Sequence, residues 1–304
     1  MLSNTYKISV GLDVKPSETK TYQEADGPDN HDQTESCPAA CPVVEPTSKD
    51  WRSNVKHYNF LGTSFDPLTA NQTLLRAKWI TLENNFRYLV TPNVDHIVRL
   101  HKEPDVYKPL YAASWLSVCD SRILQKLAQF SNIPLTIVPG SDLTEQLFDN
   151  VIEAEEAVNI IGADDEIIEK LIERYDLKSV NHHQPPMGMR HKPEAIAKAA
   201  EFIHQNPARF TFICVGSPQQ EMVAKAAMER GDCVGLGLCT GASLDFLAGR
   251  TKRAPIWMQN ARLEWLFRLL SEPRRLWKRY LVDGPKIFPI WARWHLKNAG
   301  KYKD

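Results

Sequence analysis

The sequence predicts an α/β fold of the Rossmann-like type, a mainly parallel sheet with helices on both faces. Two observations lead to this prediction. Short runs rich in β-branched and aromatic residues alternate with stretches of helical spacing, and several runs end in Gly, Pro or polar residues. Such βα alternation requires parallel strands joined by crossover helices. A chain of 304 residues is also long enough to bury a full core in this fold.

The expected strands share a high content of Val, Ile, Leu and aromatic residues. In chain order they are Phe86–Thr91, Trp115–Cys119, Leu135–Val138, Ala157–Ile161, Lys178–Asn181, Arg209–Val215 and Cys233–Leu238. The expected helices contain strong helix formers with apolar residues at helical spacing. In chain order they are Val94–His101, Ser121–Phe130, Asp142–Val151, Asp165–Tyr175, Pro193–Gln205 and Gln219–Arg230.

The two ends of the chain differ from this middle in composition. Lys and Arg balance Asp and Glu over the whole chain, 37 of each, but the charges are unevenly distributed. Residues 1–55 are rich in Pro, Ser, Thr and acidic residues, which predicts an acidic disordered tail. Residues 56–250 are expected to form the Rossmann-like domain. Residues 251–304 are strongly basic, which predicts a basic amphipathic C-terminal appendage.

The C-terminal segment combines Trp with Arg and Lys on helices of amphipathic spacing. This combination suits a membrane surface, because indole rings lie at the headgroup level and basic groups meet anionic lipid. The alternative is a basic helical hairpin packed on the domain, and both can hold together. No stretch reaches the ~18 apolar residues of a spanning helix, and the first residues lack the apolar core of a signal peptide. A cytoplasmic protein is therefore expected.

Polar residues follow the expected strands at their carboxyl ends, where α/β folds bind ligands. Thr91 and Asn93 lie where a helix begins, so they either cap that helix or stand beside backbone N–H groups that attract anions. Asp120 is either a helix cap or a general base facing a cleft. Gly216 and Gln220 follow another strand, and a Gln amide can bind phosphate or sugar hydroxyls. An exposed first helical turn is the alternative for Gln220.

Several familiar motifs are missing from the sequence. The glycine-rich segment 235–243 lacks the GxGxxG pattern of dinucleotide sites, which disfavours a nicotinamide-dependent oxidoreductase without removing it as an alternative. The sequence has no GxxxxGK[ST], HExxH or GxSxG motif. The adjacent His182 and His183 would point to opposite faces of a strand, which makes them poor joint ligands. Neither a metal nor a cofactor is predicted.

Six ordered segments carry a resemblance to a known family. One of them is Gly216-Ser217-Pro218-Gln219-Gln220-Glu221, and together they occupy residues 91–96, 139–143, 216–221, 241–249, 253–255 and 264–280. From about residue 58 to 285, the chain resembles the WecG/TagA/CpsF glycosyltransferase family. The resemblance covers most of the predicted fold.

The resemblance implies an inverting, metal-independent transferase that moves a sugar from a UDP-sugar to a polyprenyl-diphosphate-linked saccharide. Such enzymes act in exopolysaccharide, capsule or cell-wall polymer synthesis, peripherally on the inner face of the cytoplasmic membrane. The implied fold is Rossmann-like, with a C-terminal appendage that completes the site at the membrane. No cofactor besides the donor and no nucleic-acid partner is expected. The sugar transferred and the oligomeric state, a homo-oligomer included, are left open, and a non-catalytic membrane-binding protein is the remaining alternative.

The resemblance also assigns expected roles to residues at the strand ends. The catalytic aspartate falls on Asp120, and the polar donor-site pair falls on Thr91 and Asn93. The donor-site glutamine falls on Gln220, with Gly216 shaping the approach of the donor.

Basic residues complete the expected site. In the family, the aspartate is often followed by Gly, but here Ser121 and Arg122 follow Asp120. An Arg often precedes the family's Gly-Ser-Asp-Leu segment, but here the run Leu135-Thr136-Ile137 takes its place. Arg122 is therefore the candidate to replace the missing charge. The resemblance places the UDP diphosphate against arginines of the appendage, which are Arg268, Arg274, Arg275 and Arg279.

Overall fold

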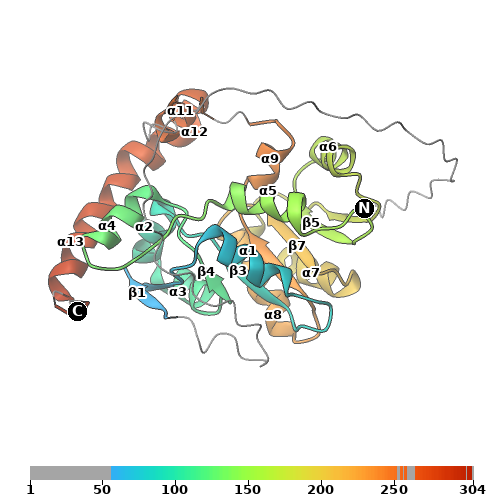
Figure 1. Cartoon of the computed structure of the whole chain (residues 1–304), viewed down its shortest axis with the longest axis horizontal. Coiled ribbons are helices and arrows are strands. Elements are labelled where there is room, and N and C mark those ends of the chain that lie inside the picture. Colours follow the sequence, from blue (N-terminus) through green and yellow to red (C-terminus); the bar gives the residue numbers. More distant parts are fainter. Residues whose placement is uncertain (1–55, 252–253, 256, 259–263, 299, 303–304) are drawn as a thin grey trace, which may run out of the picture. The chain divides into compact units, whose positions relative to one another are not determined.

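The structure, a computed structural model, describes residues 56–251, 254–255, 257–258, 264–298 and 300–302, without the side chains of Glu264 and Arg275. The expected acidic tail, residues 1–55, lies outside the described residues. A six-stranded parallel sheet forms the centre of the fold (Figure 1), which confirms the predicted α/β class. Its strands are β3 (Arg87–Val90), β4 (Leu116–Ser117), β5 (Val158–Gly162), β6 (Val180–His183), β7 (Phe210–Cys214) and β8 (Leu236–Cys239).

Helices alternate with these strands along the chain. Several begin where a side chain caps the first turn, as Ser121 and Asp164 do for α4 and α6. The helices are α1 (Ala70–Lys78), α2 (Val94–Lys102), α3 (Pro104–Ala112), α4 (Arg122–Gln129), α5 (Gly140–Asn150), α6 (Asp165–Tyr175), α7 (Pro193–Gln205), α8 (Gln219–Arg230) and α9 (Ser243–Leu247), with the short 3₁₀ turn η2 (Met189–His191).

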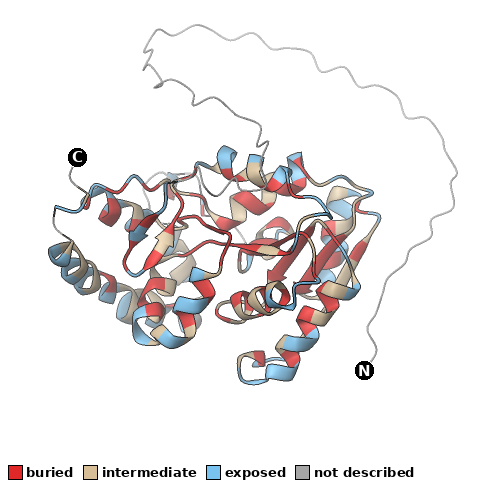
Figure 2. Ribbon diagram, turned by 90° about the horizontal axis from the view of Figure 1, so that it is seen from below, coloured by how far each residue is buried: buried red, intermediate tan, exposed pale blue. Residues whose placement is uncertain are grey.

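The helices cover both faces of the sheet, as alternate residues of β7 demonstrate. Phe212 stacks on Phe148 of α5, with ring centroids 4.9 Å apart. Its neighbour Ile213 belongs to the core cluster on the other face, together with residues of α7 and α8 such as Ala199 and Val223. Because successive side chains of a strand point to opposite faces, both faces must be covered. Figure 2 shows the resulting buried strands between helices whose outer faces are exposed.

The order of the strands determines where the site lies. The sheet has the order β4-β3-β8-β7-β5-β6, so β3 and β8 are neighbours although they are far apart in the sequence. Val90 at the end of β3 is in register with Cys239 at the end of β8. The segments that follow these strands therefore leave the same edge of the sheet side by side, which is where ligands bind in such folds.

Two expectations about strands were wrong in detail. Leu135–Val138 does not form a strand of the sheet, and only an isolated parallel bridge joins Ile137 to Cys119. Prolines at positions 134 and 139 flank this run, and β4 beside it has only two residues, so little ladder can form. The expected strand Cys233–Leu238 begins later, at Leu236, because Val234 makes an antiparallel bridge to Asn85 before the chain turns at Gly235 (φ +89).

Several elements were not predicted, among them α1, α9, the helix α3 and a short hairpin. Helix α3 follows α2 directly, after Glu103, and begins with Pro104 at a position where the missing N–H costs nothing. A separate antiparallel hairpin is formed by β1 (Tyr58–Phe60) and β2 (Thr63–Phe65). Its side chains Phe60 and Phe65 are fully buried, which anchors the beginning of the described chain to the core.

The C-terminal helices consist of α11 (Glu264–Ser271), α12 (Pro273–Trp277), the π-helical segment η3 (Lys278–Asp283), η4 (Gly284–Lys286) and α13 (Ile287–Lys297). The break between α11 and α12 falls at Pro273, as the sequence predicts. Helix α13 packs against the domain, because Trp291 donates a hydrogen bond to the Leu127 carbonyl (3.1 Å) and Trp294 contacts the Phe60 ring edge to face. No described helix is long and apolar enough to cross a membrane.

Candidate active site

The exits of β3, β7 and β8 are joined by hydrogen bonds from side chains. Gln220, at the start of α8, donates to the Cys239 carbonyl (3.3 Å) and accepts from the Gly241 N–H (3.0 Å). Thr91 donates to the same Cys239 carbonyl at 3.5 Å. The structure therefore brings Thr91 and Gln220 together at one point of the sheet edge. Gln220 is buried rather than lying in an exposed turn, with 1% of its surface accessible.

Asn93 is the N-cap of α2. Its Oδ1 accepts from the N–H groups of Asp95 (3.1 Å) and His96 (3.4 Å), while the His96 ring accepts from the N–H of Asn93. The capping alternative is thus correct for Asn93. Its Nδ2 group makes no hydrogen bond to the described part of the chain, so it can still donate to a ligand.

Asp120 lies directly beside this cap. Its N–H donates to the Pro92 carbonyl (3.1 Å), which holds the end of β4 against the segment between Thr91 and Asn93. Asp120 is not the cap of α4, because the Ser121 hydroxyl accepts from the first turn of that helix. The structure therefore places Asp120 at the carboxyl edge, one residue before the cap of α4.

The N-terminus of α5 closes the same edge. A Cβ added to Gly140 would lie 3.2 Å from the Thr91 hydroxyl and 3.3 Å from Cβ of Thr240, so only glycine allows this approach without displacement. The Thr144 hydroxyl donates to the Gly140 carbonyl within the helix (2.8 Å) and lies 3.2 Å from the Thr240 hydroxyl, with which it shares a hydrogen bond. Within the described residues no side chain caps α5, so the first N–H groups of this helix lack a capping side chain.

One arginine of the C-terminal helices reaches this site. Arg279 donates to Oδ1 of Asn93 (3.5 Å) and forms an ion pair with Asp95 (3.5 Å). Asp95 is also paired with Arg99 (2.7 Å), which in turn donates to the Ser217 carbonyl (3.0 Å). A single carboxylate therefore connects α2, the exit of β7 and the C-terminal helices.

The pKa of His96 is affected by these positive charges. Its burial and the nearby guanidinium groups of Arg279 and Arg99 lower the pKa of His96 to about 3. The ring is therefore neutral at physiological pH, which matches its role as acceptor for the Asn93 N–H. Sequence reasoning did not single out His96 or Asp95, although both stand within the segment 91–96.

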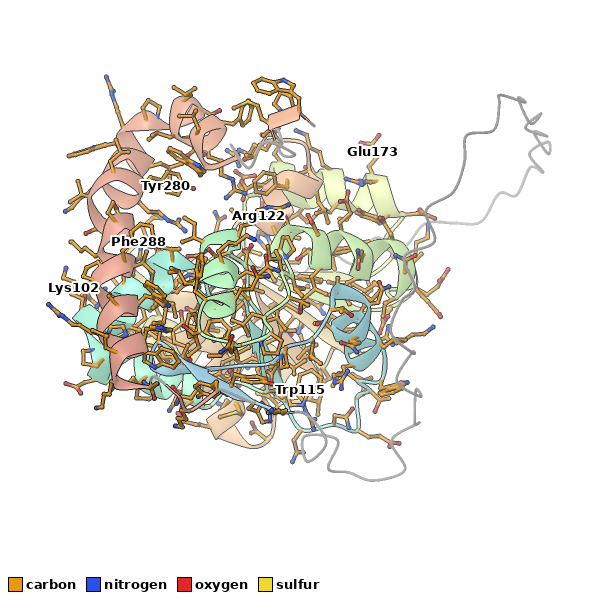
Figure 3. All side chains as sticks on the ribbon, turned by 60° about the vertical axis from the view of Figure 1, so that its left-hand side comes forward. Lys102, Trp115, Arg122, Glu173, Tyr280 and Phe288 are labelled. Carbon is orange, nitrogen blue, oxygen red and sulfur yellow. The ribbon has the colours of Figure 1, made fainter. Side chains whose placement is uncertain are left out.

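Of the other predicted basic residues, those with described side chains make no described contact with the Asn93 cap. Arg268 stacks over the Phe246 ring of α9, with 4.7 Å from guanidinium to centroid, and Arg274 is exposed on α12. The side chain of Arg275 lies outside the described residues. Arg122 is exposed at the N-terminal end of α4, and Figure 3 shows it on the side of the domain where Tyr280 lies, away from Trp115.

The segment that follows β7 contains two unusual residues, Gly216 and Glu221. Gly216 adopts φ +75, a conformation that favours glycine, with open space where a Cβ would stand. Glu221, which sequence reasoning did not select, is 1% accessible and accepts from Nε2 of Gln220 (2.9 Å). Because Glu is rarely fully buried unless it has a partner, its position beside Gln220 is the most unusual of the site.

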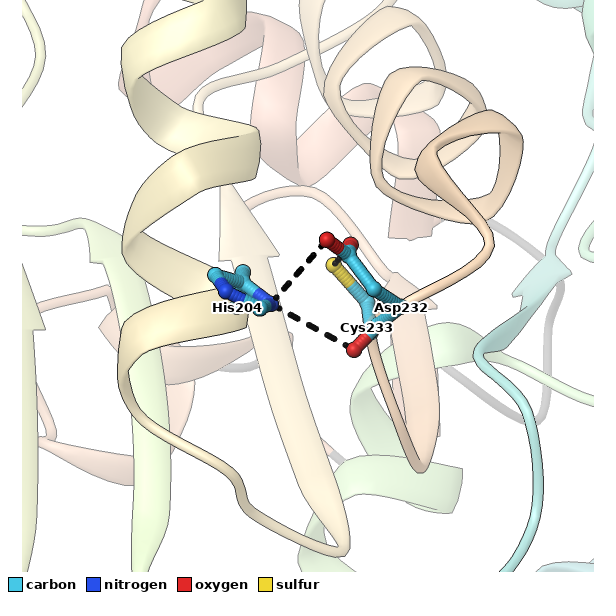
Figure 4. A group of neighbouring side chains, drawn as sticks. All are labelled: His204, Asp232 and Cys233. Atoms are coloured by element: carbon cyan, nitrogen blue, oxygen red, sulfur yellow. Dashed lines mark hydrogen bonds and ion pairs between the residues drawn. The ribbon is translucent and has the colours of Figure 1, made fainter.

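A second polar cluster lies at the opposite edge of the sheet, before β8 begins. His204 contacts the carboxylate of Asp232 at 3.4 Å, and the thiol of Cys233 lies beside them (Figure 4). Arg230 already binds both carboxylate oxygens of Asp232, at 3.0 and 3.1 Å. The pKa of Cys233 is raised to about 11 by burial and by Asp232, so its thiol stays protonated. A cation entering here would have to displace a guanidinium group and a proton.

The fold and the site together define a class of protein. A parallel α/β sheet presents a carboxylate, amides, hydroxyls, uncapped helix N–H groups and a guanidinium group at one carboxyl edge, the arrangement of an enzyme acting on a phosphorylated substrate. The sequence matches the glycosyl transferase WecG/TagA/CpsF family over residues 58–301, and the chain belongs to that family. It is therefore a glycosyltransferase of cell-surface polysaccharide synthesis that takes a sugar-nucleotide donor and an acceptor. Family membership replaces the oxidoreductase and non-catalytic alternatives.

Proposed function

We propose that the protein is an inverting, metal-independent glycosyltransferase. It moves a sugar from a UDP-sugar to a polyprenyl-diphosphate-linked saccharide at the inner face of the cytoplasmic membrane, in exopolysaccharide, capsule or cell-wall polymer synthesis. Residues 56–250 form its catalytic domain, and the basic segment 251–304 serves as the appendage that meets the membrane.

The contact between Asp120 and Pro92 carries this proposal. It holds the backbone of Asp120 next to the Thr91 to Asn93 segment, where the donor is proposed to bind. Asp120 removes the proton from the attacking acceptor hydroxyl while that oxygen bonds to the anomeric carbon. UDP leaves from the opposite face with the electron pair of the broken C–O bond, which inverts the anomeric centre.

The negative charge that grows on UDP is stabilised without a metal in this mechanism. The uncapped N–H groups of α5 meet the diphosphate together with Arg279. The Nδ2 group of Asn93 and the Thr91 hydroxyl bind the donor. Gln220, with Gly216 before it, shapes the exits of β7 and β8 around the donor. Arg122, Arg268, Arg274 and Arg275 surround the diphosphate more loosely.

The outer surface of the C-terminal helices supports the membrane part of the proposal. Trp277, Leu281 and Phe288 are each more than half exposed. Exposed Lys278 and Lys286 lie among them in the chain. Large apolar side chains beside cations favour an anionic lipid surface.

The test is a transfer assay with a panel of UDP-sugars and a short lipid-diphosphate-linked sugar acceptor. We expect transfer from one UDP-sugar, unchanged activity in EDTA, and a product whose anomeric configuration is opposite to that of the donor. Retention of configuration, or activity that EDTA abolishes and Mg²⁺ or Mn²⁺ restores, contradicts the mechanism. Transfer only from a donor with another nucleotide contradicts the assignment of UDP.

A further inference from the structure

The side chain of Gln220 is held almost entirely by the protein. Both protons of its Nε2 group are used, one by Glu221 (2.9 Å) and one by the Cys239 carbonyl (3.3 Å). Its Oε1 accepts from Gly241. A carboxamide has two donors and two acceptor lone pairs, so a single lone pair is left for a ligand. The main work of Gln220 is thus to fix the backbone at the exit of β8, and its own orientation depends on Glu221.

We propose that Glu221 is a positioning residue of the site: it orients the Gln220 carboxamide, and through it the backbone of Cys239 and Gly241 beside Thr91. The inference rests on the proposed function, because it assumes that the donor binds at this edge. Glu221 itself is buried beneath the edge and does not touch the donor.

Three buried polar atoms lie around Glu221 and bear on its protonation state. Oε2 of Glu221, the hydroxyl of Ser217 and the hydroxyl of Tyr111 are all inaccessible and make no hydrogen bond of regular geometry within the described residues. Ser217 nevertheless interacts with both Glu221 and Tyr111. A carboxylate oxygen buried without a partner is costly. Ser217 can meet Oε2 in either state of Glu221, as the donor to a carboxylate or as the acceptor from a protonated acid.

The surroundings of Glu221 favour its protonated form. Burial is the largest cause of a raised pKa at Glu221, and it outweighs the hydrogen bonds from Gln220 and Ser217 and the charge of Arg99. The other titratable groups that face Glu221 are Tyr111 of α3, Tyr88 of β3 and Cys239 of β8. Burial raises the pKa of each of them, so all three are neutral at physiological pH. Arg99 is a cation that acts on Glu221, and Asp95 already pairs with it.

Three substitutions of Glu221 distinguish a role in orienting Gln220 from a role in packing alone. Glu221→Gln has the same length, keeps an acceptor for Gln220 and offers a donor to Ser217. Glu221→Asp keeps the acid but is one methylene too short to reach Gln220, and Glu221→Ala removes the group. Glu229→Gln is the matched control, because Glu229 lies exposed on the same helix α8.

The experiment measures UDP binding by calorimetry for the wild type and the four variants. We expect UDP affinity within about threefold of wild type for Glu221→Gln and Glu229→Gln, and a loss of about tenfold for Glu221→Asp and Glu221→Ala, the effect of one lost hydrogen bond. Transfer kinetics should show the loss in KM for the donor more than in kcat. A Glu221→Gln variant as weak as Glu221→Ala, or an Asp variant as good as wild type, overturns the inference.

A second readout does not depend on the substrate. Hydrogen exchange of the Gln220 side-chain amide, followed by NMR on the complete chain, should be slow in the wild type and Glu221→Gln. It should be at least about tenfold faster in Glu221→Asp, because one amide proton then loses its partner. Equal exchange in all three overturns the inference even if the protein does not bind UDP. If the wild type fails to bind UDP but shows this exchange pattern, only the proposed function is lost.

Discussion

Thr91 and Gln220 donate hydrogen bonds to the same acceptor, the carbonyl oxygen of Cys239. One residue follows the first strand of the parallel sheet along the chain, and the other follows β7. Their common acceptor ends β8, the strand that lies between β3 and β7. Thr91, Gln220 and the Cys239 carbonyl are therefore part of both the sheet and the site. Substitutions of Thr91 or Gln220 should change stability and ligand binding together.

Thr91→Val tests the hydrogen bond between Thr91 and the Cys239 carbonyl. Valine has the shape of threonine without its hydroxyl, so the variant loses one hydrogen bond to Cys239 and any bond to the donor. We expect the free energy of unfolding to fall by about 1 kcal/mol in urea denaturation. UDP affinity should fall as well, whereas Thr91→Ser should retain both. Unchanged UDP affinity in Thr91→Val would remove Thr91 from the donor site.

Asp120→Asn tests the general base. The amide keeps the size and the backbone contact to Pro92 but cannot accept the proton of the acceptor hydroxyl. Turnover should fall on the order of 10²- to 10⁴-fold while UDP binding and thermal stability stay near wild type. Asp105→Asn, at an exposed position in the first turn of α3, is the control and should keep its activity. Turnover within threefold of wild type for Asp120→Asn would leave the base unassigned.

Arg279→Ala tests the contact between the C-terminal helices and Asn93. Loss of the guanidinium group removes a charge from the diphosphate site, and we expect UDP affinity to fall by roughly tenfold, the effect of a charge-assisted hydrogen bond. Arg293→Ala, an exposed arginine on α13, serves as control. Equal UDP affinity in both variants would mean that Arg279 only holds the helices in place.

The same variant should change the titration of His96. Arg279 is one of the causes that lower the pKa of His96 to about 3, so its removal should raise that pKa toward the ordinary 6.5. In the wild type the folded ring stays neutral while the unfolded chain takes up a proton below pH 6.5. Stability is therefore lost as the pH falls from 6.5 toward 3. NMR titration of the His96 ring measures the shift, and an unchanged value would show that Arg279 does not lie near it in solution.

The tryptophans of the C-terminal helices should divide into two groups. Trp277 is exposed, whereas Trp291 donates to Leu127 and packs on the domain. Trp277→Ala should weaken flotation with anionic vesicles and leave the free energy of unfolding unchanged. Trp291→Ala should lower that free energy by roughly 2–3 kcal/mol, somewhat less than for a fully buried Trp. Full flotation of a variant that lacks both Trp277 and the neighbouring exposed Leu281 would contradict membrane attachment through this surface.

Much of the fold followed from local patterns. The strands β3, β5 and β7 each contain at least three large apolar residues and end at turn residues, so their type and approximate bounds were predictable. The run Leu135–Val138 has a similar composition but too few ladder partners beside the short β4, and composition does not reveal a neighbour's length. Helix α3 follows α2 without a loop and carries Pro109 in its interior, a residue that argues against a helix in the sequence.

The site was predictable to a different degree. That Thr91, Asn93, Asp120 and Gln220 would gather at one edge followed from parallel topology alone. The burial of Gln220 and its bond to Glu221 did not, because both depend on how deeply α8 packs. Among the arginines of the C-terminal helices, the sequence could not distinguish Arg279 from its neighbours, because the helical phase that turns it toward Asn93 includes a π-helical segment.

The adjacency of β3 and β8 has a consequence for how the protein is made. During synthesis the chain from Thr91 onward must wait for Cys239 to leave the ribosome before the centre of the sheet can close. Pairings so distant in sequence are late and slow to form. Until then, the exposed edge of β3 is an unpaired template for other chains. The active site can therefore form only in the last stage of folding. The nascent chain is most prone to aggregation just before β3 and β8 pair.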